Sequence, residues 1–348
     1  MPILRPIQHM TTTDFLIIEP FLHDAIQART LQAAFELGII DALESNADVP
    51  VSQLLRGRSC DAAGGKFLLQ VLARSGVVQL DGASVQLTKT FRSALRFRDL
   101  LLTKLQFSEL VAADFFNRIP QLLSSSEEFM ETSKLFELFD YGRCFEITPQ
   151  NCLQAARWMK LTTTLTRYEA PVCVEHFDFS AHQEMLDLGG NSGEFAIQVC
   201  RRIPSLQACV ADLPVVCHVG TRHVAEQQMS DRIEFHPLNF TQDTIPDGHD
   251  LITCKSVLHD WPDEYVAHII GSVFNALPMG GRFLIFERQQ WDFQTEPTPY
   301  GSLPVMLFFR SYRKPEFYTF ALQKAGFRDI TVQTIRLDLP FMLVSATK

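Results

Sequence analysis

One histidine in this sequence directly follows a strand-like segment, where its side chain can take part in chemistry. His259 lies a few residues after the apolar segment 251–254, in the run Leu-His-Asp-Trp-Pro-Asp-Glu. An imidazole titrates near neutral pH, so it can take a proton from a substrate under working conditions. Without further context, however, a histidine at the end of a strand is more often a surface or capping residue.

A glycine-rich turn lies earlier in the chain and predicts a nucleotide site. Residues 186–193 read Leu-Asp-Leu-Gly-Gly-Asn-Ser-Gly, and Asp212 ends the next strand-like segment. Glycines let a ligand approach the backbone, and a carboxylate such as Asp212 can accept both hydroxyls of a ribose. The glycines fall as G-G-x-x-G and not as the G-x-G-x-x-G of pyrophosphate sites. Asp187, just before them, suits an ammonium group, so an adenosyl ligand that carries an amino acid fits better than a dinucleotide.

From residue 184 onward, short apolar runs alternate with amphipathic helical patterns. This alternation predicts a parallel sheet covered by helices on both faces. Ligands of such sheets bind at the carboxyl ends of the strands, so we expect the nucleotide there. The predicted strands are 185–188, 208–211, 233–238, 251–254, 283–286, 329–333 and 341–345.

The first hundred residues read as helices followed by a small hairpin. Two alternating segments, 77–80 and 84–87, flank an Asp-Gly pair, which is a strong hairpin signal. Three helices with a two-stranded wing describe a winged-helix module, which can bind DNA or serve as a dimerisation platform. Residues 100–175 are predicted to be helical throughout.

The composition excludes several classes of protein. A chain of 348 residues fits two domains, and its formal charge of −9 argues against wide contact with nucleic acids or anionic membranes. No apolar run is long enough to span a bilayer. The eight cysteines form no C-x-x-C pair and the histidines lack metal-ligand spacing, which predicts reduced thiols and no metal site. The N-terminus, with Arg5 and His9, has no signal-peptide core, so we expect a cytoplasmic protein.

Three motifs together resemble those of one enzyme family. They are the glycine-rich turn, Asp212-Leu213-Pro214, and the Leu-His-Asp-Trp-Pro-Asp-Glu element that contains His259. The chain resembles the small-molecule O-methyltransferases of the caffeate and hydroxyindole type, which use S-adenosylmethionine and include bacterial natural-product enzymes. The similarity covers most of the chain and is strongest from residue 184 to residue 287.

The resemblance implies both a fold and an activity. The fold is an α/β Rossmann-like methyltransferase domain with a mostly parallel sheet, preceded by a mainly α winged-helix dimerisation domain. We expect the winged-helix domain at 1–104, a helical segment of the substrate pocket at 105–178 and the catalytic domain at 179–348. The implied reaction methylates a hydroxyl of a small aromatic acceptor and releases S-adenosylhomocysteine. The implied assembly is a homodimer, with no nucleic-acid or membrane partner.

The family's pattern also assigns roles to individual residues. His259 is the general base, and such assistance is typically worth about 10²–10⁴ in rate. Glu287 is the carboxylate that orients this base, although it can instead pair with Arg282 or Arg288. A methionine or an aromatic residue on a helix is more often plain core, which is the alternative for the acceptor site. The implied cofactor site comprises Asp187, Gly189, Gly190, Gly193, Asp212, Leu213, Asn239, Phe240, Lys255 and Thr163, and the acceptor site comprises Trp158, Met159, Asp260 and Met306.

The sequence departs from the family's pattern in two places. Asn239 stands where an aspartate usually receives the adenine amino group, although its amide carbonyl can still accept that hydrogen bond. Residues 309–316 replace a Gly-x-Glu-Arg-Thr element whose glutamate is a second acid beside the histidine. Unless Glu316 turns inward, one acid holds His259 instead of two. This departure affects oxygen methylation more than cofactor binding.

Other functions remain open at this point. C- or N-methylation needs the same cofactor with a differently placed base, and the altered 309–316 segment also suits a relative repurposed for another reaction. A different class of protein is a winged-helix regulator, which binds DNA in a salt-dependent way and turns nothing over. The His-Asp-Trp element and the negative net charge both argue against the regulator.

Overall fold

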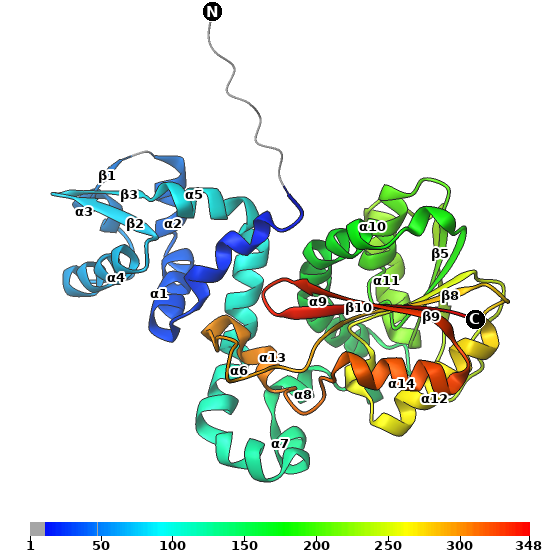
Figure 1. Ribbon diagram of the computed structural model, residues 1–348. Coiled ribbons are helices and arrows are strands. Elements are labelled where there is room, and N and C mark those ends of the chain that lie inside the picture. Colours follow the sequence, from blue (N-terminus) through cyan, green and yellow to red (C-terminus); the bar gives the residue numbers. More distant parts are fainter. Residues whose placement is uncertain (1–10, 47) are drawn as a thin grey trace, which may run out of the picture.

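The computed structural model describes residues 11–46 and 48–348, so Arg5 and His9 lie outside the described residues. A domain of short helices and a small sheet comes first, long helices follow, and a seven-stranded sheet forms the rest (Figure 1). No helix in the described part of the chain is both long and apolar enough to cross a membrane.

The N-terminal domain has the predicted winged-helix arrangement. Strands β2 and β3 form the wing and pair antiparallel from Val78↔Leu87 to Asp81↔Ser84, and β1 pairs with the other edge of β3. Gly38 adopts a left-handed conformation with φ of 67°, which ends α1 and starts α2. The elements are η1 (Asp14–Leu22), α1 (Ala25–Glu36), α2 (Ile39–Ser45), β1 (Val49–Pro50), α3 (Val51–Leu55), α4 (Ala62–Arg74), β2 (Val78–Asp81), β3 (Ser84–Leu87), α5 (Lys89–Ala94) and η2 (Leu95–Phe97).

Two long helices connect this domain to the large sheet. Helix α6 begins at Arg98 and is kinked at Arg118, two residues before Pro120. The expected boundary between residues 104 and 105 therefore falls inside α6. The elements of this connection are α6 (Arg98–Ser124), α7 (Ser126–Thr132), α8 (Lys134–Leu138), η3 (Tyr141–Cys144), α9 (Pro149–His176) and η4 (Phe179–Ala181).

The large sheet contains all seven predicted strands, and its order is β6-β5-β4-β7-β8-β10-β9. The first five strands in this order are parallel, while β10 runs antiparallel to β8 and to β9. The prediction of a mostly parallel Rossmann-like sheet is confirmed. The strands are β4 (Glu184–Leu188), β5 (Gln207–Asp212), β6 (Ile233–Pro237), β7 (Leu251–Lys255), β8 (Arg282–Arg288), β9 (Arg328–Arg336) and β10 (Pro340–Thr347).

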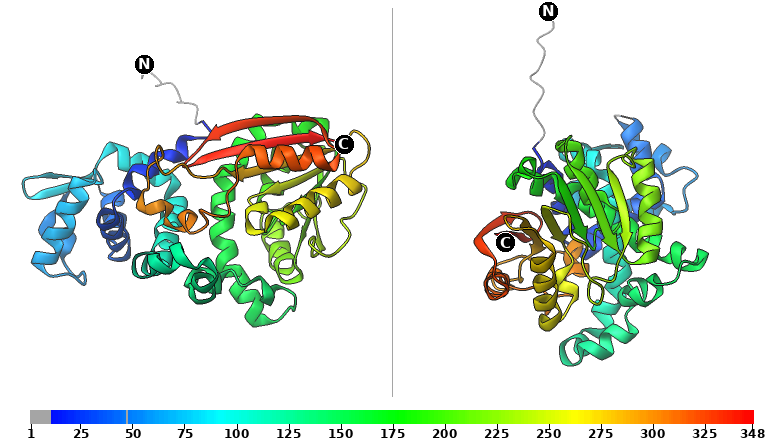
Figure 2. Two further views of the ribbon diagram at one scale, coloured as in Figure 1. Left: turned by 60° about the horizontal axis from the view of Figure 1, so that its bottom comes forward. Right: turned by 90° about the vertical axis from the view of Figure 1, so that its right-hand side faces the viewer.

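Helices cover both faces of the sheet, which gives three layers (Figure 2). Helices α9, α10 and α11 pack together on one face, and α12 and α14 pack together on the other. The chain order reverses between β4 and β7, so the carboxyl ends of these two strands form the switch point where ligands of such sheets bind. The remaining helical elements are α10 (Glu194–Arg202), α11 (Pro214–Glu226), η5 (Leu258–Asp260), α12 (Asp263–Ala276), η6 (Tyr300–Ser302), α13 (Leu303–Met306) and α14 (Pro315–Ala325).

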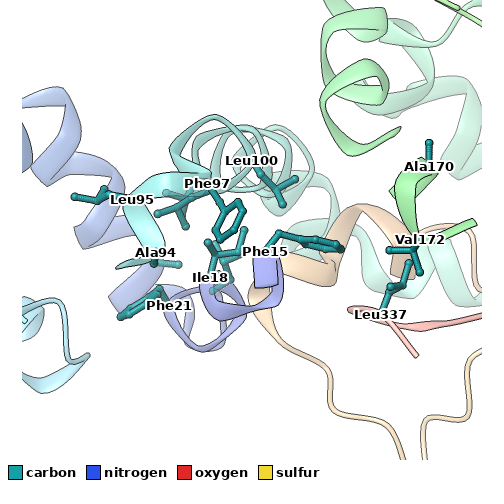
Figure 3. Packing of buried hydrophobic residues seen from close by; sticks show 14 of the residues in the cluster. Phe15, Ile18, Phe21, Ala94, Leu95, Phe97, Leu100, Ala170, Val172 and Leu337 are labelled. Atoms are coloured by element: carbon teal, nitrogen blue, oxygen red, sulfur yellow. The ribbon is translucent and has the colours of Figure 1, made fainter. Parts of the chain in front are cut away.

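The N-terminal domain shares a hydrophobic core with the catalytic domain. Phe15 and Ile18 of η1 are buried in the same cluster as Val172 of α9 and Leu337, which follows β9 (Figure 3). The ring of Phe15 lies 5.6 Å from that of Tyr168. Because burial of apolar side chains is the main favourable term in folding, these contacts hold the two domains together.

A buried ion cluster crosses the same boundary. The ammonium group of Lys104, on α6, contacts the carboxylates of Glu19 on η1 and Asp338 in the β9–β10 turn. The Lys104 Nζ to Asp338 Oδ2 distance is 2.8 Å, and the lysine side chain is 8% exposed. Both partners lie on other elements, so a single cation joins three segments that are distant in the sequence.

We predict that Lys104→Met lowers the free energy of unfolding by about 3–5 kcal/mol, because it leaves two carboxylates without their cation in a buried place. Urea denaturation followed by circular dichroism measures this change. The control is Arg336→Met, which removes a cation from an ion pair with Glu296 whose arginine is 74% exposed. We expect this control to cost less than about 1 kcal/mol. Equal losses in the two variants would contradict the structural importance of the buried cluster.

Candidate active site

The pairing of two parallel strands brings His259 and Glu287 to one edge of the sheet. Strand β7 ends at Lys255 opposite Phe286 of β8, and the next amide, of Ser256, donates to the Phe286 carbonyl at 3.0 Å. Ser256 has φ of 55°, a left-handed conformation that turns the chain into η5. His259 lies in this short helix, and Glu287 is the next residue along β8.

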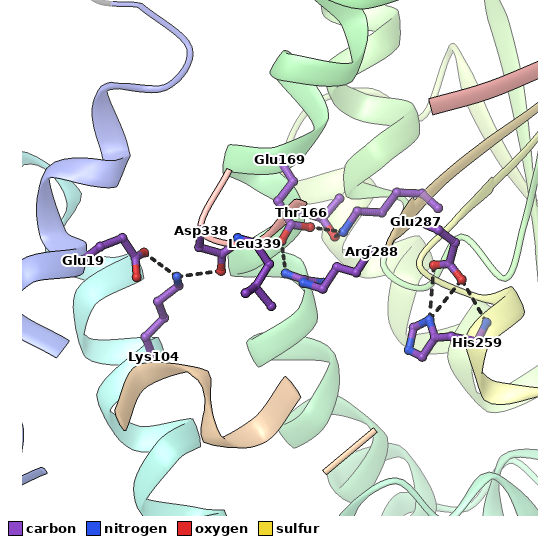
Figure 4. Close-up of polar contacts among 10 residues, drawn as sticks. Glu19, Lys104, Thr166, Glu169, His259, Glu287, Arg288, Asp338 and Leu339 are labelled. Carbon is purple, nitrogen blue, oxygen red and sulfur yellow. Dashed lines mark hydrogen bonds and ion pairs between the residues drawn. The ribbon is translucent and has the colours of Figure 1, made fainter. Parts of the chain in front are cut away.

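The Glu287 carboxylate holds His259 through both its backbone and its ring (Figure 4). One carboxylate oxygen, Oε2, accepts the backbone N–H of His259 at 2.9 Å, and imidazole Nδ1 lies 3.1 Å from both carboxylate oxygens. Glu287 is fully buried and the histidine side chain is 11% exposed. An Nδ1–H donated to this carboxylate leaves Nε2 as the nitrogen that can accept a proton.

A second acid lies near the other ring nitrogen. Oδ1 of Asp260 is 3.4 Å from Nε2 of His259, and Oδ2 of Asp260 accepts a hydrogen bond from the Tyr141 hydroxyl at 3.0 Å. The expectation that a single acid holds the histidine is therefore wrong, because the neighbouring residue supplies another. Burial lowers the pKa of His259, but the charges of Glu287 and Asp260 outweigh this effect, so that the pKa is raised overall.

Two carboxylates lie next to the glycine-rich turn, and Asp187 is buried while Asp212 is half-buried. Oδ1 of Asp187, on β4, accepts the Thr253 hydroxyl at 2.7 Å, while its Oδ2 is buried without a hydrogen-bond partner among the described residues. Oδ2 of Asp212, at the end of β5, accepts the backbone N–H of Asn191 at 2.8 Å, and its Oδ1 accepts that of Leu213 at 2.7 Å. Asp212 is thereby fixed beside the turn. Burial raises the pKa of Asp187 to about 7 and that of Asp212 to about 6.

The backbone of the turn leaves room that a larger residue would fill. Gly189 has φ of 66°, and a Cβ there would lie 2.8 Å from the Val257 side chain. A Cβ on Gly190 would lie 2.5 Å from Oδ2 of Asp187. Gly193 then caps the start of α10. An adenosyl ligand with an ammonium group fits this arrangement, because the unpartnered Asp187 oxygen can accept its N–H groups and the glycines let it approach.

Two other predicted cofactor residues are engaged by protein neighbours. The side-chain carbonyl of Asn239 accepts the Thr241 hydroxyl at 2.7 Å and the Thr241 backbone N–H at 3.3 Å, so its expected bond to an adenine amino group has to compete with both. The ammonium group of Lys255 contacts Glu169 of α9 and donates to the Thr166 hydroxyl at 3.0 Å.

Three further predicted residues lie on α9 or pack close to η5. Phe240 packs edge-on against Trp261, with 5.9 Å between ring centroids. The Thr163 hydroxyl donates to that of Ser192 at 2.6 Å, which ties α9 to the glycine-rich turn. Thr163 and Met159 line a cavity of about 480 Å³ between α6 and α9.

Several aromatic side chains lie close to the histidine or to Tyr141. The Trp158 ring lies 5.5 Å from Phe139 and 5.9 Å from Tyr141, the residue bonded to Asp260. The Phe308 ring lies 5.8 Å from the ring of His259 and is nearly perpendicular to it. Met306, in α13, packs against the large hydrophobic core two residues before Phe308.

Sequence reasoning missed three residues of this site, Tyr141, Phe308 and Tyr312. The Tyr312 ring lies 5.0 Å from that of His259, in the segment that the sequence marked as a departure from the family pattern. Glu316 instead lies in the first turn of α14 and is not a partner of the histidine. The unusual segment 309–316 was thus a signal, but it did not say which of its residues faces His259. Among the described residues, no group of three or more His, Cys, Asp or Glu is placed to hold a metal ion.

Comparisons with known proteins agree with this geometry. Residues 127–328 match the model of the O-methyltransferase domain family. A 3-hydroxy-5-methyl-1-naphthoate 3-O-methyltransferase of Streptomyces sahachiroi is 33% identical over 189 residues, which are 53% of this chain and 53% of that enzyme, so the match spans about half of its length. An L-tyrosine C(3)-methyltransferase of Streptomyces lavendulae is 23% identical over 318 residues, 89% of this chain and 85% of that one.

A solved structure shares the fold over nearly the whole chain. It is human N-acetylserotonin methyltransferase in complex with S-adenosylmethionine, with a TM-score of 0.71 and 22% identity. The alignment covers 93% of this chain and 94% of the human one. Together with the winged-helix domain and the sheet order, this likeness fixes the fold class.

We predict that affinity for S-adenosylhomocysteine falls as the pH is lowered from about 8 to about 5.5. The ionised forms of Asp212 and Asp187 accept the ribose hydroxyls and the ammonium group, and their raised pKa values mean that both take up protons over this range. Titration calorimetry at several pH values measures the change. Asp212→Asn should bind more weakly at pH 8 and show a shallower pH dependence, whereas equal wild-type affinity at both ends of the range would exclude these carboxylates from the site.

Proposed function

This chain belongs to the O-methyltransferase family, and we propose that it uses S-adenosylmethionine to methylate a hydroxyl of a small aromatic acceptor, with His259 as general base. The family model matches more than half of the chain. The observation that carries the proposal is the contact between His259 and the buried Glu287, at the same edge of the sheet as the glycine-rich turn.

The carboxylates and the turn support the choice of cofactor. When bound, S-adenosylmethionine supplies an electrophilic methyl group on a sulfonium sulfur. Asp212 accepts the ribose hydroxyls, and the free oxygen of Asp187 accepts the ammonium group. Gly189 and Gly190 let the ligand approach the backbone, and Leu213, Phe240 and Thr163 border the same space. Lys255 reaches this edge too, although Glu169 has to share it with any ligand carboxylate.

The step that the protein's own side chains carry out is a proton transfer to Nε2 of His259. Glu287 accepts the Nδ1–H and fixes the tautomer, so Nε2 is free to take the proton of the acceptor hydroxyl as the methyl group is transferred. The positive charge on the imidazolium is then offset by Glu287 and by Asp260. Most of the rate enhancement comes from holding the acceptor oxygen in line with the methyl group, to which Asp260 and Tyr141 contribute on the acceptor side.

The aromatic residues around the histidine support a flat, apolar acceptor. Trp158, Phe139 and Phe107 form a continuous series, with ring centroids 5.5 Å and 6.1 Å apart. Phe308 links the ring of His259 to Phe136, whose centroid lies 5.5 Å away. Aromatic rings pack favourably against one another in offset or edge-on arrangements, so such walls favour an aromatic acceptor.

Methylation of carbon is the second candidate. Loss of the phenolic proton to His259 also makes the ring carbon next to the hydroxyl nucleophilic, so that the same site can methylate this carbon. The carbon then loses its own hydrogen as a proton and the oxygen regains one, which restores the aromatic ring. The observation in its favour is the segment around Tyr312, which has no carboxylate beside the histidine. Mass spectrometry of the product separates the two, because an O-methyl group forms an ether and a C-methyl group leaves the hydroxyl free.

We also propose that the protein is a homodimer formed through its N-terminal domain. That domain exposes Ile26 of α1 (66%), Phe67 of α4 (58%) and Leu80 of β2 (40%). Contiguous exposed apolar side chains mark interaction surfaces, and we propose that a second copy of the chain covers these three. Sedimentation equilibrium measures the molecular mass, and a monomer at micromolar concentration would contradict this assembly.

We predict that His259→Asn lowers the rate of methyl transfer by about 10²–10⁴, because it removes the proton acceptor and keeps a side chain of similar size. Binding of S-adenosylhomocysteine should stay within about twofold of the wild type, because the residue lies on the acceptor side. The measurements are product formation with a panel of phenols and titration calorimetry. Equal losses of activity and of cofactor affinity would refute the role of general base.

We also expect Glu287→Gln to move the acidic limb of the pH–rate profile to lower pH. The Glu287 charge raises the pKa of His259, so its removal lets the imidazole stay neutral at lower pH. The rate at the plateau should fall as well, because an amide can offer its own N–H groups to Nδ1 and no longer fixes the tautomer. An unshifted limb would show that another group controls the profile.

A further inference from the structure

Tyr312 occupies a place beside the histidine that the described function does not use. It lies between α13 and α14, and its ring is 5.0 Å from the ring of His259 with 36° between the two planes. The residue is 6% exposed. Its hydroxyl makes no hydrogen bond with the described residues. The hydroxyl oxygen is not completely buried, so a ligand can reach it.

The neighbouring residue fixes Tyr312 relative to the histidine. The Arg313 guanidinium donates to the carbonyl of Leu258 at 3.0 Å and to that of Trp261 at 2.6 Å, the residues on either side of His259 and Asp260. It also pairs with Asp263 at 2.8 Å. These contacts join the segment around Tyr312 to the loop that carries the base, so the phenol ring is held in front of the imidazole.

The charges around Tyr312 keep its hydroxyl protonated. Burial raises the pKa of this phenol; Arg288 opposes the rise, while Glu287, Asp260 and Glu169 add to it. A neutral phenol is a hydrogen-bond donor, whereas an ionised carboxylate at the same place accepts hydrogen bonds only. The residue beside His259 thus offers a donor to whatever binds there.

Two cations lie near Tyr312, and one carboxylate neutralises only part of their charge. Glu169 binds both Lys255 and Arg288, so this buried group of three carries one net positive charge (Figure 4). Nε of Arg288 is buried and has no partner among the described residues. The positive group offsets the charge of Glu287, while the Asp260 carboxylate beside Nε2 of His259 still disfavours an anion at that nitrogen.

We propose that Tyr312 binds the acceptor by donating a hydrogen bond to an oxygen of a carbonyl or carboxylate group. This group is attached to the ring carbon next to the one that carries the methylated hydroxyl. This inference rests on the proposed methyl transfer and names its substrate class, the ortho-hydroxy carbonyl compounds. Tyr312 is then a catalytic residue, since it touches the acceptor.

The chemistry of such acceptors explains why a donor is useful. Their hydroxyl is hydrogen-bonded to the adjacent carbonyl within the molecule, which hinders its ionisation. When Tyr312 donates to the carbonyl, the hydroxyl is released toward Nε2 of His259, which takes its proton. The acceptor oxygen then forms a bond to the methyl carbon while the electron pair of the methyl–sulfur bond passes to sulfur. The charge that develops on the acceptor spreads to the carbonyl, where Tyr312 stabilises it.

The test compares three acceptors of similar size by titration calorimetry in the presence of S-adenosylhomocysteine. Salicylate carries a carboxylate beside its hydroxyl, ortho-hydroxyacetophenone carries a ketone, and ortho-ethylphenol carries neither. We expect Tyr312→Phe, which keeps the ring, to weaken binding of salicylate, of the ketone or of both by about tenfold, and to leave ortho-ethylphenol within about twofold. A loss confined to salicylate or to the ketone assigns the oxygen that is recognised.

The matched control is Tyr300→Phe, in η6 and outside this site, which removes a tyrosine hydroxyl that has no hydrogen-bond partner in the described part of the chain. It should leave all three affinities unchanged. Tyr312→Glu is a second variant, and it should select against salicylate because it puts a negative charge where the donor was. Equal losses for the three acceptors, or no loss for any, would overturn the proposal.

Failure of the Tyr312 proposal can be distinguished from failure of the proposed methyl transfer. The acceptor affinities are also measured without S-adenosylhomocysteine, and its own binding is titrated separately. Failure of the wild type to bind S-adenosylhomocysteine or to form methylated product would refute the methyl transfer. Failure of the wild type to prefer either carbonyl compound to ortho-ethylphenol would refute the role of Tyr312 alone.

Discussion

The buried carboxylate of Glu287 determines how the rest of the candidate site is arranged. A carboxylate without exposure to water needs charged or hydrogen-bonding partners, and here both the backbone and the ring of His259 supply them. The histidine therefore cannot move without leaving a buried charge unpaired. The parallel pairing of β7 and β8 places the two residues within reach, and the left-handed conformation of Ser256 turns η5 over the edge of the sheet.

A series of buried ionic contacts extends this constraint across the molecule. Glu169 of α9 binds Lys255 and Arg288 at the ends of β7 and β8, so α9 is tied to the same edge of the sheet. A second, separate cluster joins Asp338 and Lys104 to Glu19 in the N-terminal domain (Figure 4). Buried pairs are screened little by salt, so these contacts hold the helical segment in a fixed relation to the catalytic residues.

The two sides of the site differ in how closely they follow the pattern of the family. On the cofactor side, the turn, Asp187 and Asp212 have the arrangement that an adenosyl ligand needs, and Asn239 is the departure. On the acceptor side, the ring of Tyr312 lies beside His259, and Asp260 supplies a carboxylate from within the motif itself. The residues proposed for the cofactor and for the acceptor lie on separate elements, so the proposed acceptor side can change while the cofactor side keeps its chemistry.

The sequence alone determined the class of the fold and the half of the site that depends on local motifs. Short apolar runs predict strands, and the turn at Gly189 and Gly190 is a local motif. The sheet, the wing and the positions of Asp187 and Asp212 beside the turn were therefore predictable. The contacts of Tyr312, Lys255 and Glu169 were not, because each pairs residues from elements far apart in the chain. A side chain's partner depends on how helices pack on the sheet, and periodicity reports only which face is buried. The sequence therefore pointed to His259 as the candidate base, while the tertiary structure decided what surrounds it.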